Sequence, residues 1–193
     1  VEPKRPRRWG LPLVAAIAAG NHVYLRPSEH APRTALFLRD LLAGVFPPER
    51  VAVALGEADL AAQFAALPFD HLFFTGSTAL GRKVMQAAAP NLTPVTLELG
   101  GKSPALIAPD YPLGHAVERI VTGKCFNAGQ TCIAPDYVLL PRNAMEAFIA
   151  QARASVARRY PTLAHNPDAT AVVNERQFQR LHALITDARE RGV

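Results

Sequence analysis

Two residues of this sequence have the type and the surroundings that covalent catalysis requires. Cys132 ends the segment 127–132 (Asn-Ala-Gly-Gln-Thr-Cys), which follows a helical pattern and carries a glycine shortly before the sulfur. A cysteine in such a place can be an exposed thiolate with backbone N–H groups nearby. Glu98 lies near the end of an apolar stretch and is followed by Leu99 and two glycines. A lone acid among apolar side chains has a raised pKa, which suits a general base near neutral pH.

Both residues also have an ordinary structural interpretation. Cys132 could be a buried core cysteine, which is the default for Cys125, and Glu98 could be a surface acid at the end of a strand. The spacing of the two cysteines fits neither a disulfide framework nor a zinc knuckle, and the six histidines show no paired metal-ligand spacing. We therefore expect no metal site.

A third candidate is the turn at residues 76–81 (Gly-Ser-Thr-Ala-Leu-Gly), between an apolar strand pattern and a helical one. Free backbone N–H groups at the start of a helix, together with its positive dipole end, predict an anion site. Gly76 would let the backbone come close to a ligand, Ser77 could donate or cap, and Gly81 would permit tight packing. Glycines occur in such turns for steric reasons alone, and the standard Gly-x-Gly-x-x-Gly fingerprint is absent.

The elements that must position these residues alternate along the chain. An apolar helical pattern runs from Leu11 to Gly20-Asn21, where a left-handed cap is easy. Strands are then expected at 22–26, 51–55, 71–75, 95–99, 104–108 and 137–140, and helices at 32–45, 58–66, 78–89, 113–126, 145–156 and 175–189. Strands that are apolar on both faces and alternate with helices predict an α/β fold with a doubly wound, mostly parallel sheet.

Composition and charge limit the class of protein. The chain has 193 residues, of which 49% are hydrophobic, so it can bury a core. Much of the net charge of +5 comes from Lys4, Arg5, Arg7 and Arg8. A basic end could contact nucleic acid, but no nucleic-acid-binding motif follows it, so we expect a solvated end and no nucleic-acid partner. No apolar stretch can cross a bilayer and no secretory signal is recognisable, which predicts a cytoplasmic protein.

Three segments, taken in order, resemble the aldehyde dehydrogenase superfamily. They are residues 73–78 (Phe-Phe-Thr-Gly-Ser-Thr), 97–102 (Leu-Glu-Leu-Gly-Gly-Lys) and 129–132 (Gly-Gln-Thr-Cys). Gly20-Asn21 and residues 26–29 (Arg-Pro-Ser-Glu) are similar to the cofactor segment of the same family, so the resemblance runs from about Leu11 to the C-terminus. The sequence around Glu98 and Cys132 looks most like that of the branch that acts on fatty and aromatic aldehydes, which includes the coniferyl-aldehyde dehydrogenases.

The resemblance implies a function and a division of the chain. Residues 1–97 would be part of a Rossmann-like domain that binds NAD or NADP, and residues 98–193 would begin an α/β catalytic domain. The Cys132 thiolate would add to the aldehyde substrate and form a thioester after hydride transfer, and Glu98 would activate the water that releases the carboxylic acid. The Cys132 backbone N–H would help to hold the oxyanion.

The resemblance also implies the cofactor contacts. Glu29 would hydrogen-bond the adenosine ribose, Ser77 would lie at the pyrophosphate, and Gly76 and Gly81 would shape that turn. The remaining residues expected to bind the cofactor are Arg26, Ser28, Leu99 and Gly100. Members of the family are homo-oligomers, so the full-length enzyme is expected to form a dimer.

The sequence departs from the family pattern in several places. The family's Trp-Asn pair supplies a side-chain amide to the oxyanion hole, but here Trp9 is followed by Gly10 and residues 1–10 do not resemble that segment, so one oxyanion donor is missing. The family's lysine before Pro-Ser-Glu is Arg26. The family's N-terminal region, its oligomerisation hairpin and the C-terminal segment that contacts the nicotinamide have no counterpart here. We therefore expect a truncated product or a partial gene, and the alternative function is an inactive remnant that keeps a nucleotide-binding or association role.

Overall fold

The computed structural model describes residues 7–163 and 165–192, with only the backbone of residues 7–11. The chain divides between Gly100 and Gly101 into two compact units, and each is described by itself below. The boundary predicted after residue 97 falls near this division, while the roles assigned to the two parts stay predictions. The basic side chains at positions 4, 5, 7 and 8 lie outside the described part of the chain.

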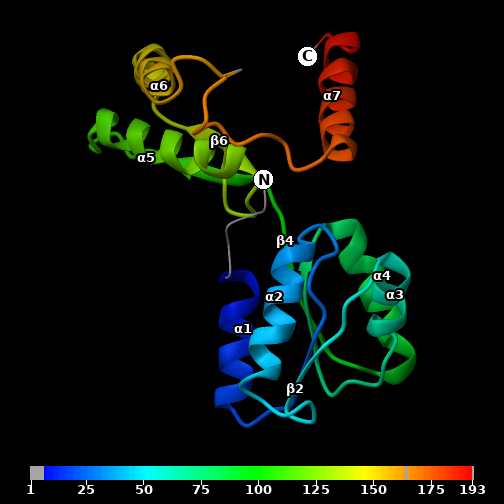
Figure 1. Cartoon of the computed structure of the whole chain (residues 1–193). Coiled ribbons are helices and arrows are strands. Elements are labelled where there is room, and N and C mark those ends of the chain that lie inside the picture. The colour runs from blue at the N-terminus through cyan, green and yellow to red at the C-terminus, as the bar shows by residue number, and fades with distance from the viewer. Residues whose placement is uncertain (1–6, 164, 193) are drawn as a thin grey trace. The chain divides into compact units, whose positions relative to one another are not determined.

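The first unit alternates helices and strands as the sequence predicts. Its elements are α1 (Arg7–Ala18), β1 (Val23–Leu25), α2 (Pro32–Ala43), β2 (Val51–Val53), α3 (Ala58–Ala65), β3 (Leu72–Gly76), α4 (Thr78–Ala88), η1 (Ala89–Asn91) and β4 (Val95–Leu99). β1 pairs with β2 and β3 with β4, both in parallel. Within the described residues these ladders form two separate pairs, not one continuous sheet. Helices α1 and α2 lie on one side of the strands and α3 and α4 on the other (Figure 1), which is the doubly wound arrangement.

Side chains pack against both faces of β1 and β2, although only one face is buried. On one face, Leu13 of α1, Leu42 of α2 and Val51 of β2 form a buried cluster. Tyr24 of β1 points to the opposite face, because successive residues of a strand alternate. There its ring meets Phe64 of α3 at a centroid distance of 4.9 Å.

The cap predicted after α1 and the tight packing predicted for α4 are both present. Gly20 adopts a left-handed conformation with φ of +87°, and Arg50 Nη1 donates to its carbonyl oxygen at 2.6 Å. A Cβ atom on Gly81 would lie only 3.0 Å from a methyl carbon of Leu99. Gly81 therefore allows α4 to pack closely on β4.

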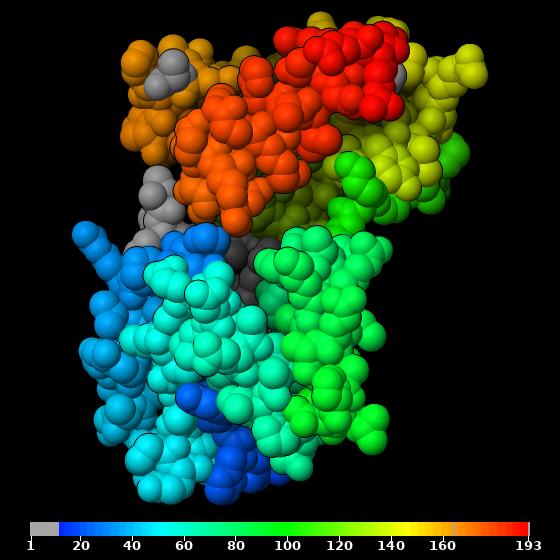
Figure 2. All heavy atoms as spheres, turned by 90° about the vertical axis from the view of Figure 1, so that its right-hand side faces the viewer, coloured from blue at the N-terminus to red at the C-terminus, as the bar shows by residue number. Residues whose placement is uncertain are grey.

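The second unit begins with β5 and carries the predicted thiol. Its elements are β5 (Ser103–Leu106), α5 (Leu113–Cys125), η2 (Phe126–Gly129), β6 (Pro135–Leu139), η3 (Arg142–Ala144), α6 (Met145–Arg159) and α7 (Glu175–Glu190). β5 and β6 are parallel, with an irregularity between Ser103 and Pro104. α7 buries none of its residues. It lies on the outside of this unit, in orange and red in Figure 2.

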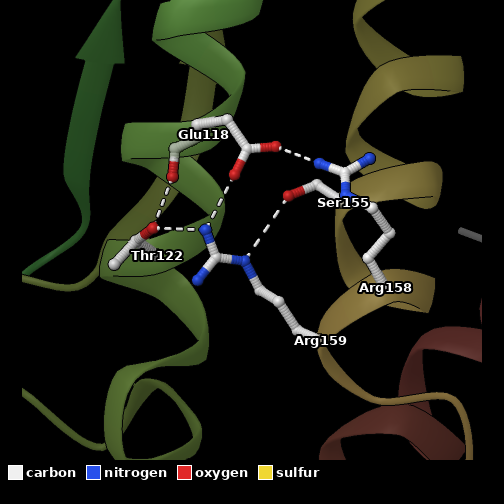
Figure 3. Close-up of polar contacts among 5 residues, drawn as sticks. All are labelled: Glu118, Thr122, Ser155, Arg158 and Arg159. Atoms are coloured by element: carbon white, nitrogen blue, oxygen red, sulfur yellow. Dashed lines mark hydrogen bonds and ion pairs between the residues drawn. The ribbon is translucent and has the colours of Figure 1, made fainter.

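A polar cluster joins α5 to α6 (Figure 3). Both oxygens of Glu118 are paired, with Arg158 Nη2 at 2.5 Å and Arg159 Nη2 at 2.8 Å. Arg159 Nη2 also donates to the Thr122 hydroxyl at 2.8 Å. The fully buried Ser155 hydroxyl and then the Arg159 guanidinium lower the pKa of Glu118. These contacts help to hold α5 in place, and α5 leads into the loop of residues 127–131 that precedes Cys132.

Two kinds of feature are absent from the part of the chain that the structure describes. None of its helices has the length and apolar character needed to span a membrane. No cluster of three or more histidine, cysteine, aspartate or glutamate residues is placed to hold a metal ion. The cytoplasmic location stays a prediction.

Candidate active site

Arg26 and Glu29 form an ion pair just after β1. Arg26 Nη1 lies 2.8 Å from Glu29 Oε2, and the two side chains are 14% and 23% exposed. Arg26 Nη2 donates to the carbonyl oxygens of Gly56 and Glu57 at 2.9 and 3.1 Å. Arg26 thus joins the segment after β1 to the segment after β2. Its Nε is buried without a hydrogen-bond partner among the described residues.

This environment keeps Glu29 ionised. Burial alone would raise the pKa of its carboxyl group, but its own backbone N–H and the hydrogen bond and charge of Arg26 outweigh burial and lower it. Glu29 Oε1 lies 3.8 Å from His30 Nε2, beyond hydrogen-bond distance. That oxygen therefore keeps lone pairs that could accept from a hydroxyl group.

Ser28 has a local structural role. Its hydroxyl accepts from the backbone N–H of His30 at 3.2 Å, and its carbonyl oxygen accepts from the N–H of Ala31 at 3.2 Å. These two bonds close the turn that carries Glu29 toward the first turn of α2.

The turn between β3 and α4 has the geometry of an anion site. Ser77 is the N-cap of α4, and its hydroxyl accepts from Leu80 N–H at 3.3 Å. The N–H groups of Thr78 and Ala79 have no partner within the described chain, as expected for the first turn of a helix. A Cβ atom on Gly76 would clash with the ring of Phe74, at 2.4 Å. The structure therefore needs glycine at position 76 because a side chain would collide with Phe74, and not because the backbone has a positive φ.

Glu98 lies beside this turn, in register with Thr75 of β3. Leu97 and Leu99 face Gly81 of α4, so Glu98 points to the other face of β4. Its side chain is exposed, and no apolar enclosure forms around it in this unit. Gly100 is exposed and has open space around its Cα.

Cys132 follows a tightly coiled loop. Asn127, Ala128 and Gly129 all have left-handed backbones, with φ of 54°, 53° and 72°. Cys132 is exposed and Cys125 is partly buried. The role of Cys132 as the reactive thiol stays a prediction. Within the described chain the Cys132 N–H donates no hydrogen bond, and the Cys132 carbonyl oxygen accepts from Ser103 Oγ at 3.4 Å.

Sequence reasoning did not identify Gln130. Its Nε2 donates to the carbonyl oxygens of Asn127 and Ala171, and its Oε1 accepts from Val173 N–H. No local pattern could reveal this, because two of the three partners lie 41 and 43 positions further along the chain.

The structure brings the predicted residues into three groups. Arg26, Ser28 and Glu29 share the segment after β1, and a second group on β3, β4 and the start of α4 holds Gly76, Ser77, Gly81, Glu98, Leu99 and Gly100. Cys132 lies in the second unit. The convergence of Cys132 with Glu98 stays a prediction.

Comparison with known proteins identifies relatives along nearly the whole chain. The profile of the aldehyde dehydrogenase family matches residues 9–193. The probable coniferyl aldehyde dehydrogenase of Pseudomonas aeruginosa is 55% identical over 181 residues, which is 94% of this chain and 38% of that protein. The coniferyl aldehyde dehydrogenase of Pseudomonas sp. strain HR199 is 49% identical over 191 residues, 95% of this chain and 40% of that protein. The chain thus spans about two fifths of the length of these relatives.

Solved structures share the fold. A mutant of aldehyde dehydrogenase C from Pseudomonas syringae, in complex with NAD+ and octanal, superposes with a TM-score of 0.80 at 35% identity. The match covers 92% of this chain and 38% of that one. The α/β fold predicted from the sequence is therefore confirmed.

Proposed function

The chain belongs to the aldehyde dehydrogenase family, and we propose that it carries the thiol and much of the cofactor site of an enzyme that oxidises an aldehyde to a carboxylic acid with NAD(P)+. The observation that carries the proposal is Cys132 itself. Its side chain is exposed, its N–H is free within the described chain, and the loop before it is held in an unusual left-handed conformation. An exposed thiol with a free N–H group beside it is what a catalytic nucleophile requires, because the substrate can reach the sulfur.

The reaction would proceed by covalent catalysis. The Cys132 thiolate forms a bond to the carbonyl carbon, and the carbonyl electron pair moves to oxygen, where the Cys132 N–H stabilises the negative charge. Loss of hydride from that carbon leaves a thioester. Glu98 then takes a proton from water, the resulting hydroxide adds to the thioester, and the carboxylic acid leaves as the thiolate is restored. When bound, NAD(P)+ supplies the acceptor for the hydride.

The residues of the first unit fit a dinucleotide. The free N–H groups of Thr78 and Ala79 and the Ser77 hydroxyl suit a pyrophosphate, since anions bind at helix N-termini. Glu29 suits the adenosine ribose, because its Oε1 can accept from a ribose hydroxyl while Arg26 holds Oε2. An ionised carboxylate at this place would repel a 2′-phosphate, so we infer a preference for NAD+ over NADP+.

The names of the relatives support a proposal for the substrate class. Two of them are named as coniferyl aldehyde dehydrogenases, and a structural neighbour binds octanal. We propose an aromatic aldehyde such as coniferyl aldehyde as the first substrate to test, with a long-chain aldehyde second. A dimeric assembly and a cytoplasmic location belong to the same proposal.

Competitive labelling of the two thiols tests the nucleophile. An electrophilic aldehyde analogue should modify Cys132 much faster than Cys125, with the two rates read by peptide mass spectrometry. Iodoacetamide, which lacks the aldehyde, serves as the control reagent. Equal and slow labelling of both cysteines by the analogue would overturn the proposal and favour an inactive remnant.

A further inference from the structure

Gln130 ties the Cys132 loop to a distant segment of the same unit. Its Nε2 donates to Ala171 O at 3.0 Å, and its Oε1 accepts from Val173 N–H at 2.9 Å. A carbonyl oxygen and the N–H group two residues later are the pair that a neighbouring strand would engage. The side-chain amide of Gln130 therefore takes the place of a strand neighbour for residues 171–173.

The same amide also holds the coiled loop in front of Cys132. Nε2 donates to Asn127 O at 3.1 Å, and Asn127 Nδ2 donates in return to Gln130 O at 3.2 Å. Asn127 and Ala128 are left-handed without being glycine, a conformation that persists only where surrounding contacts enforce it. Gln130 contacts Asn127 inside the loop, and the same side chain binds residues 171–173 outside it.

We propose that Gln130 is a positioning residue: its amide locks the loop 127–131 against residues 171–173 and so fixes the place and direction of the Cys132 sulfur. This inference rests on the proposed role of Cys132. Gln130 reaches no reacting atom itself. It acts by limiting the conformations that the loop can adopt, which is how orientation raises the rate of a bimolecular attack.

Three variants separate the contacts. Gln130→Ala removes all three side-chain hydrogen bonds. Gln130→Glu keeps an acceptor for Val173 N–H but loses both donors, and Val173→Pro deletes that N–H while leaving Gln130 intact. Gln179→Ala is the matched control, because Gln179 is exposed on α7 and, among the described residues, its side chain hydrogen-bonds only to Glu175.

The first readout is the ratio of Cys132 to Cys125 labelling by the aldehyde analogue. We expect Gln130→Ala and Gln130→Glu to lower this ratio about tenfold to a hundredfold, and Val173→Pro to lower it less. Gln179→Ala should leave it unchanged. A purely structural role of Gln130 would accelerate the labelling of both cysteines together, and that result, or an unchanged ratio, would refute the proposal.

The second readout does not depend on the thiol. Amide hydrogen exchange of Gln130, Thr131 and Ala134, whose N–H groups donate within the loop, should accelerate in Gln130→Ala and not in Gln179→Ala. If Cys132 of the unmodified chain labels no faster than Cys125, the proposed function fails, and the exchange rates still decide whether Gln130 holds the loop. Unchanged exchange of these three amides would exclude the positioning role.

Discussion

At the scale of single residues, Cys132 and Cys125 can be compared directly, because both are cysteines but only Cys132 is exposed. Under the proposed function, we predict that Cys132→Ser lowers the rate of aldehyde oxidation about a thousandfold or more, since an unactivated hydroxyl is a far weaker nucleophile than a thiolate. Cys125→Ser is the control and should retain most of the activity. Reduction of the cofactor, followed by absorbance, measures both. A Cys132→Ser protein as active as Cys125→Ser would remove Cys132 from the mechanism.

A second prediction at this scale concerns the Arg26–Glu29 pair. Because the pKa of Glu29 is lowered in the folded protein, the pair stabilises the fold fully above pH 4.5, the ordinary value for this carboxyl, and loses its effect as the pH falls further. Arg26→Ala should raise the pKa of Glu29, as measured by NMR titration. Arg26→Lys should raise the pKa of Glu29 less, since lysine keeps the positive charge but lacks the planar guanidinium group with its several N–H donors. The interpretation would be wrong if the Glu29 titration were the same in all three proteins.

The elements show what local patterns can and cannot predict. The apolar periodicity of α2 and the stop at Gly20 are local, so the helices and strands could be assigned from the sequence. The pairing of the strands into separate ladders depends on contacts between distant residues, which no local pattern encodes. For the same reason Glu98 was expected among apolar side chains and lies exposed on its strand, since the residues that flank it in sequence point to the opposite face.

The conformation of η2 leads to a prediction at the scale of elements. Gly129 has φ of +72°, and an added Cβ would lie 3.2 Å from the carbonyl oxygen of Lys124. Gly129→Ala should therefore lower the free energy of unfolding by about 1–2 kcal/mol or more, since an L residue is strained in this region. Gly101→Ala is the matched control, because its Cβ would meet nothing within 4 Å. Thermal or denaturant unfolding compares the two, and equal stability would contradict the strained-loop description.

At the scale of the whole molecule, burial is unevenly distributed among the helices. α5 buries Ala116, Val117 and Val121, whereas α7 buries none of its residues. We predict that the amides of α7 exchange with solvent much faster than those of α5, because a helix without tertiary packing is only marginally stable in water. Hydrogen exchange followed by mass spectrometry checks this directly. Protection of α7 equal to that of α5 would show that a surface covers it in solution.

The three strand ladders also bear on how the polypeptide folds during its synthesis. Each ladder joins strands that are consecutive in the chain, β1 with β2, β3 with β4 and β5 with β6. Within the described residues, each ladder can form once the second of its two strands has left the ribosome. We therefore expect folding to advance vectorially, one strand–helix–strand unit after another, as nascent chains of increasing length leave the exit tunnel.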